Sequence, residues 1–273
     1  MGPVHLNLPR DVLAAQFENN LDLHPSSYRD MSAPAGDFEK IQQASRIISE
    51  ANKPVIIAGG GIKNTAGQTQ ALALAEELNC PIVTSPGHGD AIAFSHPLNA
   101  GQMGPRGNIV ASRLVKEADV ILALGTRLGF NSTFYSYDNI NRDAKIIHVE
   151  IEPSAIGRFF PIEVGIWGDA PTIAKQLLNS LKLSSNRKLA DKWTSQFQVE
   201  RKKYLQKRDS DAILTNPIQP TGLFKTLRSV LPKNSSITMD AGTLCLQATD
   251  ALNYFQHKSL FTPLDFGLVG FSF

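Results

Sequence analysis

The chain has 273 residues, of which 42% are hydrophobic and 19% are charged, and its formal net charge is +2. This length and ordinary globular composition predict one large domain or two smaller ones, and the near-neutral charge indicates neither a nucleic-acid nor a membrane partner. No run approaches the roughly 20 apolar residues of a membrane span. The first nine residues lack the basic start and apolar core of a signal peptide, which predicts a cytoplasmic protein. Cys80 and Cys245 are far apart and too few for a four-cysteine zinc site, so we expect both to be reduced and at least half-buried.

The first 36 residues do not have the pattern of a complete domain. Gly2–Pro9 alternates in hydrophobicity like a strand and stops at a proline. Because a lone strand cannot bury its faces, we expect it to be the last strand of an upstream domain or an edge addition. Residues 13–36 contain prolines, serines and a glycine in the proportions of a linker.

From Asp37 onward, helical and strand patterns alternate regularly, which predicts an α/β fold. The expected helices are 37–51, one opened by a Thr65/Gln68 capping box, 108–117, and one capped by Asp169 that runs to Leu181. The expected strands are 55–58, 81–85, 120–124 and 146–151. Gly101–Gly107 is too rich in glycine for a regular element and is expected to be a loop.

Three of these strands are almost continuously apolar and end in glycine or charged residues. Such strands are typical of a parallel sheet buried on both faces, and ligands of open parallel sheets bind at the carboxyl ends of the strands. Gly59, Gly60 and Gly61 follow the first strand, Arg127 follows the second, and Glu150 and Glu152 end the third. Close backbone approach, a phosphate counter-charge and acceptors for ribose hydroxyls together predict a nucleotide site. A plain tight turn, a surface arginine and an acid that opens a helix explain the same residues about as well.

Residues 183–218 are a charged connector in which Leu189, Trp193 and Phe197 recur every four residues, as on one face of an amphipathic helix. Within it, the basic run Arg201–Arg208 is expected to be a solvated helix face. A second, incomplete α/β unit is predicted for residues 219–273, with a strand at 236–240 and another at 258–263. The apolar end Gly267–Phe273 is a poor place for a domain to finish, so we expect a fragment.

No set of nucleophile, base and acid is visible, so the catalytic residues remain unassigned. His88, in Pro86-Gly-His-Gly-Asp90, is expected to be a solvated loop histidine.

Read together, these segments resemble the thiamine-diphosphate enzymes of the acetolactate synthase type. The resemblance rests on Lys53–Gly61, Cys80–Thr84, Gly101–Gly107, Ala118–Arg127, Ile146–Gly157 with Gly168-Asp169, and Ile237–Gly242. It implies that residues 1–36 are the end of the pyrimidine-binding domain with a linker. Residues 37–182 would then be a middle domain with a doubly wound, six-stranded parallel sheet, and 183–218 a linker helix. Residues 219–273 would be the start of the diphosphate-binding domain.

The resemblance also implies cofactor sites. The middle domain of this family binds FAD, ADP or no nucleotide. The residues implied to line that site are Gly59, Gly60, Gly61, Gly104, Arg106, Arg127, Glu150, Glu152 and Asp169. Those implied to approach thiamine diphosphate are Asp240, Gly242, Thr243, Val269 and Gly270. The activating glutamate and the Gly-Asp-Gly…Asn motif for Mg²⁺ are expected before Met1 and beyond Phe273, so no metal ligand is assigned and the chain alone is expected to be inactive.

For the complete enzyme, the resemblance implies a carboligase or decarboxylase of 2-oxo acids in branched-chain amino acid biosynthesis, acting as a homodimer or homotetramer. Sulfoacetaldehyde acetyltransferase and glyoxylate carboligase are sister activities that fit the same residues. A rival from another class is a stand-alone, non-catalytic nucleotide-binding module. An NAD-dependent deacylase is disfavoured because the zinc cysteines of that class are absent from the sequence.

Overall fold

The computed structural model describes residues 4–16, 24–28, 30, 32–183 and 189–272. The chain forms two units, residues 1–32 and residues 33–273, and each is described by itself. The first contains the short helix α1 (Arg10–Ala14) and the 3₁₀ turn η1 (Pro25–Ser27). Residues 4–9 form no strand. Residues 2 and 3 of the predicted strand lie outside the described residues, and its assignment to an upstream domain stays a prediction.

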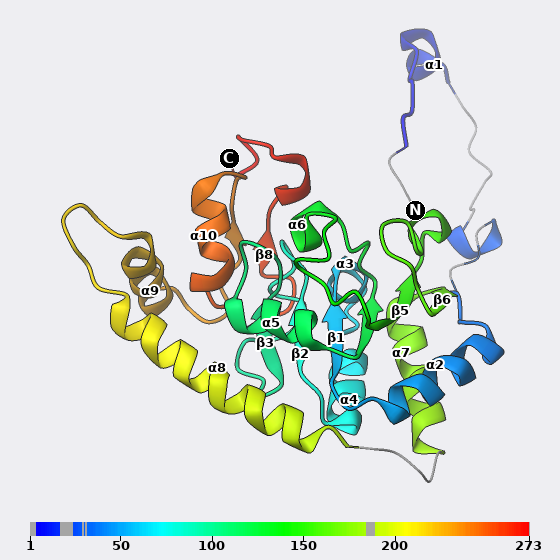
Figure 1. The fold of residues 1–273 in the computed structure, drawn as a ribbon. Coiled ribbons are helices and arrows are strands. Elements are labelled where there is room, and N and C mark those ends of the chain that lie inside the picture. Colours follow the sequence, from blue (N-terminus) through cyan, green and yellow to red (C-terminus); the bar gives the residue numbers. More distant parts are fainter. Residues whose placement is uncertain (1–3, 17–23, 29, 31, 184–188, 273) are drawn as a thin grey trace. The chain divides into compact units, whose positions relative to one another are not determined.

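The second unit is built on the predicted six-stranded parallel sheet, with strand order β3-β2-β1-β4-β5-β6 (Figure 1). Its strands are β1 (Pro54–Ala58), β2 (Ile82–Thr84), β3 (Asn99–Gln102), β4 (Val120–Leu124), β5 (Lys145–Glu150) and β6 (Val164–Trp167). The chain runs outward from β1 to β3 and returns to the other side of β1 with β4. The turns after β1 and β4 therefore lie at the point where the strand order reverses, which is where such sheets bind ligands.

Alternate strand residues face two separate cores, as expected for strands buried on both sides. Ile56 and Leu122 face the core formed with helices α2 (Phe38–Glu50), α4 (Gln68–Leu78) and α7 (Ala170–Lys182). Ile57 and Ile121 face the core formed with α5 (Ile109–Glu117) and α8 (Asp191–Asp211). The helices cover both faces of the sheet, so only its edges and strand ends remain for binding.

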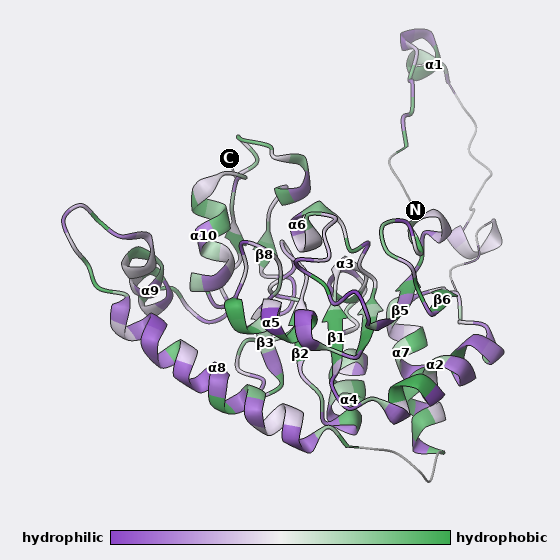
Figure 2. Cartoon of the chain, viewed as in Figure 1, coloured by the Kyte–Doolittle hydropathy of each residue, from purple (hydrophilic) through white to green (hydrophobic). Residues whose placement is uncertain are grey.

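Helix α8 matches the predicted linker helix. It is mainly hydrophilic, whereas the strands at the centre of the sheet are hydrophobic (Figure 2). Trp193 and Phe197 are buried, and the Trp193 indole donates a hydrogen bond to Pro54 O at 3.1 Å. Trp193 and Phe197 lie on one face of α8, and their contacts attach this helix to the sheet. None of the helices in the described ranges is both long and apolar enough to cross a membrane.

The structure corrects three details of the predicted elements. The glycine run is not followed by a simple turn, because a short helix, α3, spans Gly60–Asn64. The expected capping box does not form: α4 begins at Gln68 after Gly67, and the Thr65 hydroxyl donates to Gly61 O instead. The predicted loop Gly101–Gly107 begins inside β3, where Gly101 has φ +101° at a break in the strand register. Gly101 can adopt the backbone conformation that this irregular edge strand needs, but a glycine-rich run does not have the sequence pattern of a strand.

The C-terminal part contains the elements predicted for an incomplete α/β unit. They are α9 (Pro220–Val230), β7 (Ile237–Thr238), α10 (Thr243–Ala251), β8 (Leu260–Phe261) and the 3₁₀ turn η3 (Leu264–Phe266). Strands β7 and β8 are parallel and pair with each other. A small core that includes Phe224, Ala248 and Leu260 holds this part together.

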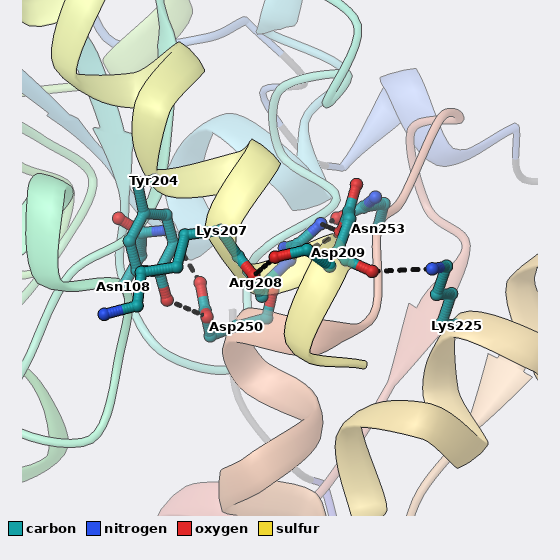
Figure 3. Close-up of polar contacts among 9 residues, drawn as sticks. Asn108, Tyr204, Lys207, Arg208, Asp209, Lys225, Asp250 and Asn253 are labelled. Carbon is teal, nitrogen blue, oxygen red and sulfur yellow. Dashed lines mark hydrogen bonds and ion pairs between the residues drawn. The ribbon is translucent and has the colours of Figure 1, made fainter. Parts of the chain in front are cut away.

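Charged side chains join α8 to α9 and α10 (Figure 3). Tyr204 and Asn108 both donate to the Asp250 carboxylate, and Arg208 donates to Asp250 O at 2.8 Å. Lys225 donates to Asp209 O at 2.6 Å. Cations at these positions satisfy carbonyl groups near the carboxyl ends of α8 and α10, where the helix dipole favours positive charge. The basic run in α8 therefore contributes to packing in addition to forming a solvated face.

Candidate functional site

The residues that the sequence predicted for a nucleotide site all lie at the carboxyl ends of the strands of the six-stranded sheet. The triple glycine follows β1, Arg127 follows β4, and Gly104 and Arg106 follow β3. Glu150 ends β5, Glu152 lies two residues further on, and Asp169 follows β6. Because all six strands are parallel, these groups share one edge, as predicted. Their partners, however, are largely other groups of the same chain.

Two of the three glycines allow the turns after β1 and β4 to touch. A Cβ on Gly61 would lie 2.7 Å from Gly125 Cα, and one on Gly59 would lie 2.5 Å from Thr126 Cβ. The amide of Gly59 donates to Leu124 O at 3.0 Å, and that of Gly61 donates to Gly125 O at 2.9 Å. These two amides therefore have partners within the chain, and the close approach that only glycine permits is between two turns.

The cations at this edge also have partners in the chain. Arg127 lies 3.5 Å from the Asp265 carboxylate, which also accepts from Asn131 at 2.9 Å. Both charged side chains of this ion pair are at least half exposed, so the contact is weak and exchangeable. The Arg106 guanidinium lies 5.2 Å from the ring centre of Phe134. Gly104, with φ +114°, lets its loop approach Asn131 O.

The three acids at this edge hold local backbone groups. Glu152 Oε1 accepts from Ser154 N and Oγ, and these hydrogen bonds lower the pKa of Glu152. Asp169 caps α7 by accepting from Thr172 N at 3.1 Å and Thr172 Oγ1 at 2.8 Å. Glu150 is buried and accepts from Ile151 N at 2.9 Å. For Glu152, the geometry is that of the acid before Pro153, which the sequence had left open as an alternative.

His88 is not the solvated loop histidine that we expected. Its Nδ1 is buried with no hydrogen-bond partner in the described chain, and its ring lies where a Cβ on Gly60 would be 3.1 Å from Cε1. Burial, with a contribution from the nearby Lys63 charge, lowers the pKa of His88 to about 4, so the ring is neutral at pH 7. No local pattern predicted this burial, because groups near His88 are distant in the sequence: Thr262 and Leu264 lie beside Gly87, and the Asp265 charge acts on the His88 ring.

The residues implied to approach thiamine diphosphate lie on two turns of the C-terminal part, 240–243 and 267–272, which hydrogen bonds join. Asp240 accepts from Gly270 N at 2.7 Å and from Ser272 N and Oγ, both at 2.8 Å. These bonds lower the pKa of Asp240, the Gly270 amide having the largest effect. Gly242, at φ +135° in open space, precedes α10, and Thr243 is the first residue of that helix. Val269 is 81% exposed between Gly267 and Gly270, which also have positive φ.

The turn 240–243 has features that suit a diphosphate. Helix α10 has nine residues, and its first amides carry the partial positive charge of a helix N-terminus. Gly242 leaves the approach to these amides free of side-chain atoms. Within the described residues, no group of three or more His, Cys, Asp or Glu side chains could hold a metal ion.

Sequence reasoning missed two buried charges at the same edge, Lys63 and Asp90. They form an ion pair at 3.0 Å, with side chains 9% and 0% exposed. Both residues stand beside segments that the sequence analysis had singled out: Lys63 lies two residues after the glycine run, and Asp90 ends the Pro-Gly-His-Gly segment. Nothing local distinguishes such charges from solvated loop residues.

The sheet order and the two turns define a doubly wound α/β domain followed by the first elements of a second α/β unit. The family model of the thiamine pyrophosphate enzyme central domain matches residues 41–177, so the chain belongs to the thiamine pyrophosphate enzymes.

Similar proteins carry two names. The sulfoacetaldehyde acetyltransferase of Roseovarius nubinhibens is 32% identical over 289 residues, covering 98% of this chain and 47% of that protein. The protein of the same name from Rhodobacter capsulatus is 38% identical over 181 residues, or 66% of this chain and 30% of that protein. The acetolactate synthase large subunit of Buchnera aphidicola is 29% identical over 249 residues, or 88% of this chain and 42% of that protein. The chain spans about half the length of the curated relatives that match nearly all of it.

Proposed function

We propose that this chain is the middle and following part of a thiamine-diphosphate-dependent carboligase or decarboxylase of the acetolactate synthase type, acting on 2-oxo acids. The observation that carries the proposal is the central-domain match over residues 41–177, followed in the same chain by the Asp240–Thr243 turn. In this proposal, residues 37–182 are the middle domain, 183–218 the linker helix and 219–273 the start of the diphosphate-binding domain.

Thiamine diphosphate supplies the electron sink for carbon–carbon bond cleavage and formation, and the protein binds and orients it. The residues of this chain proposed to hold it are Gly242 and Thr243, whose amides begin α10, and the turn around Gly270. Asp240 does not point a free carboxylate at the cofactor, because three hydrogen bonds tie it to Gly270 and Ser272. Its proposed role is to shape the turn. The exposed Val269 would then contact either the cofactor or another subunit of a homodimer or homotetramer.

The test is an activity assay on the protein encoded by the whole reading frame that contains this segment. With thiamine diphosphate and Mg²⁺, we expect carbon dioxide release from pyruvate. We expect none from residues 1–273 alone, because this chain spans only about half the length of its curated relatives. The proposal is wrong if the complete protein, supplied with thiamine diphosphate and Mg²⁺, releases no carbon dioxide from a 2-oxo acid. Turnover by the chain alone would contradict the proposed division of the site.

A second candidate is a sulfoacetaldehyde acetyltransferase, the name that several of the similar proteins carry. The 38% identity over 181 residues to one of them favours it. The same preparation distinguishes the two candidates: consumption of sulfoacetaldehyde without carbon dioxide release from pyruvate would establish the second and overturn the first.

We also propose that ADP or FAD binds at the carboxyl edge, with Arg127 on the diphosphate. Support comes from the exposure of Arg127 and from its weak pairing with Asp265. The neighbouring rings of Phe130, Phe134 and Tyr135 offer an aromatic surface, with Phe130 and Phe134 stacked at 4.7 Å. The glycine amides at positions 59 and 61 and the Glu152 Oε1 atom do not support it, because they already have partners.

Replacement of Asp265 by Asn tests this nucleotide site directly. Asp265→Asn removes the charge that competes with a phosphate for Arg127, so we expect tighter ADP binding by calorimetry, by about threefold to tenfold. Asp143→Asn, at an exposed loop position, is the matched control and should not change the affinity. Flavin absorbance in the purified protein would identify FAD as the ligand. Absence of both ADP binding and flavin would overturn the nucleotide site.

A further inference from the structure

The outer edge of β8 has no neighbouring strand among the described residues. On its inner edge, β8 pairs with β7: Ile237 N donates to Ser259 O at 2.6 Å and Met239 N donates to Phe261 O at 2.9 Å. Successive residues of a strand turn their peptide groups to opposite sides. The N–H and C=O of Leu260 therefore face away from β7. They are buried with that residue, which is 1% exposed, so they require partners.

Lys63 and Asp90 supply these partners. Asp90 Oδ2 accepts from Ser259 N at 2.8 Å and from Leu260 N at 2.9 Å. Lys63 Nζ donates to Leu260 O and lies 3.5 Å from Gly87 O. The two charged groups are 3.0 Å apart, and both side chains are buried. One side chain thus binds the amide of Leu260 while the other binds its carbonyl group.

This arrangement reproduces what an adjacent strand would provide. A neighbouring strand offers a carbonyl acceptor to each free N–H and an N–H donor to each free C=O. Here a carboxylate is the acceptor and an ammonium group is the donor, which makes both hydrogen bonds charge-assisted. Burying either charge alone would be costly, but each neutralises the other and both have backbone partners. The pair therefore closes an edge that would otherwise be open.

We propose that Lys63 and Asp90 are positioning residues that take the place of a strand beside β8. They thereby hold segment Ser259–Asp265 on the carboxyl edge of the six-stranded sheet. Lys63 comes from α3, directly after the triple glycine, and Asp90 comes from the turn after β2. Five residues after Leu260, Asp265 contacts Arg127 and Asn131. The proposal does not depend on the cofactor or reaction proposed above.

Hydrogen–deuterium exchange on the full chain, read at single amides by NMR, tests this. In the wild type, we expect the Leu260 amide to be strongly protected. Two double variants separate a strand-like role from a simple ion pair. Lys63→Met with Asp90→Leu keeps the volume apolar but leaves Leu260 unpaired. Lys63→Glu with Asp90→Lys keeps an ion pair but points the ammonium toward the N–H groups and the carboxylate toward the C=O.

We expect both double variants to lose protection at Leu260 by about tenfold or more, because each forfeits hydrogen bonds to a charged group. The amide of Ile121 in the central strand β4 should keep its protection, which shows that the sheet remains folded. Lys175→Met, at an exposed site on α7, is the control and should leave Leu260 unchanged. Wild-type protection in the charge-exchanged variant would overturn the proposal, since an ion pair alone would then suffice. An unprotected Leu260 amide in the wild type would overturn it without any variant.

Discussion

The contact between Gly61 and Gly125 gives a prediction that separates packing from phosphate binding. A Cβ at position 61 would lie 2.7 Å from Gly125 Cα, whereas carbon atoms in good contact are about 3.5–4.0 Å apart. Gly61→Ala must therefore move the turns after β1 and β4 apart by about 1 Å. The movement would stretch the 2.9 Å hydrogen bond from Gly61 N to Gly125 O.

Overpacking of this kind lowers the free energy of unfolding by about 1–3 kcal/mol. Gly129→Ala is the matched control on the same sheet edge, because nothing lies within 4 Å of its added Cβ and its φ of −73° suits alanine. We expect the control to stay within about 0.5 kcal/mol of the wild type. Urea unfolding followed by the fluorescence of the buried Trp193 measures both variants.

Equal unfolding midpoints for Gly61→Ala and Gly129→Ala would refute the reasoning. Nucleotide titration of the same two proteins completes the test. If Gly61 were required in this turn for phosphate contact rather than for packing, Gly61→Ala would abolish ADP binding without loss of stability. We expect a loss of stability instead, with ADP affinity changed only as far as Arg127 is displaced.

Three further predictions concern buried or capped side chains. Trp193→Phe removes the hydrogen bond to Pro54 O and should lower the free energy of unfolding by about 1 kcal/mol, whereas Trp193→Ala should lower it by about 3–5 kcal/mol; urea unfolding followed by circular dichroism measures both. The hydrogen bonds to Asp240 lower its pKa and stabilise its turn above the unfolded-state pKa of about 4, and this stabilisation is lost as pH falls further. The protection factor of the Gly270 amide, which corrects for the pH dependence of intrinsic exchange, should therefore fall below about pH 4, and a protection factor that does not change with pH would contradict this. Burial lowers the pKa of His88 to about 4, with Lys63, Asp90, Arg127 and Asp265 as its charged neighbours, so the free energy of unfolding should decrease as pH falls from about 6.5 to 4. In urea unfolding, His88→Asn should make the free energy of unfolding depend less steeply on pH in this range. An unchanged pH dependence would count against the buried neutral ring.

The sheet could be predicted because its information is local. The runs Val55–Ala58 and Val120–Leu124 are apolar at every position, and only strands buried on both faces have that pattern. Parallel strands between helices then place all their carboxyl ends on one edge, whatever the strand order. That is why Gly59–Gly61, Arg127 and Glu150 could be assigned to a common edge from the sequence.

The roles of these residues could not be predicted, because their partners are distant in the chain. Asp265 reaches Arg127 across 138 residues, and Leu260 reaches Lys63 across 197. The sequence also could not separate a glycine that approaches a ligand from one that approaches another turn. Gly61 and Gly125 require each other, and neither position alone shows it. Short polar contacts such as Glu152 with Ser154 were visible as an alternative, because a helix cap is again a local pattern.

Segment Ser259–Asp265 connects the two proposed cofactor regions. It is held at Leu260 by Lys63 and Asp90 and at Asp265 by Arg127 and Asn131, and it leads within five residues to Gly270. A nucleotide that takes Arg127 from Asp265 must weaken one of these attachments. If nucleotide binding changes the affinity of the Gly270 turn for thiamine diphosphate, then by linkage thiamine diphosphate changes the affinity for the nucleotide by the same factor. ADP affinity measured with and without thiamine diphosphate should therefore differ by about twofold to tenfold, and Asp265→Asn should abolish the difference. Equal ADP affinities in the wild type would show that the segment fixes geometry without transmitting occupancy.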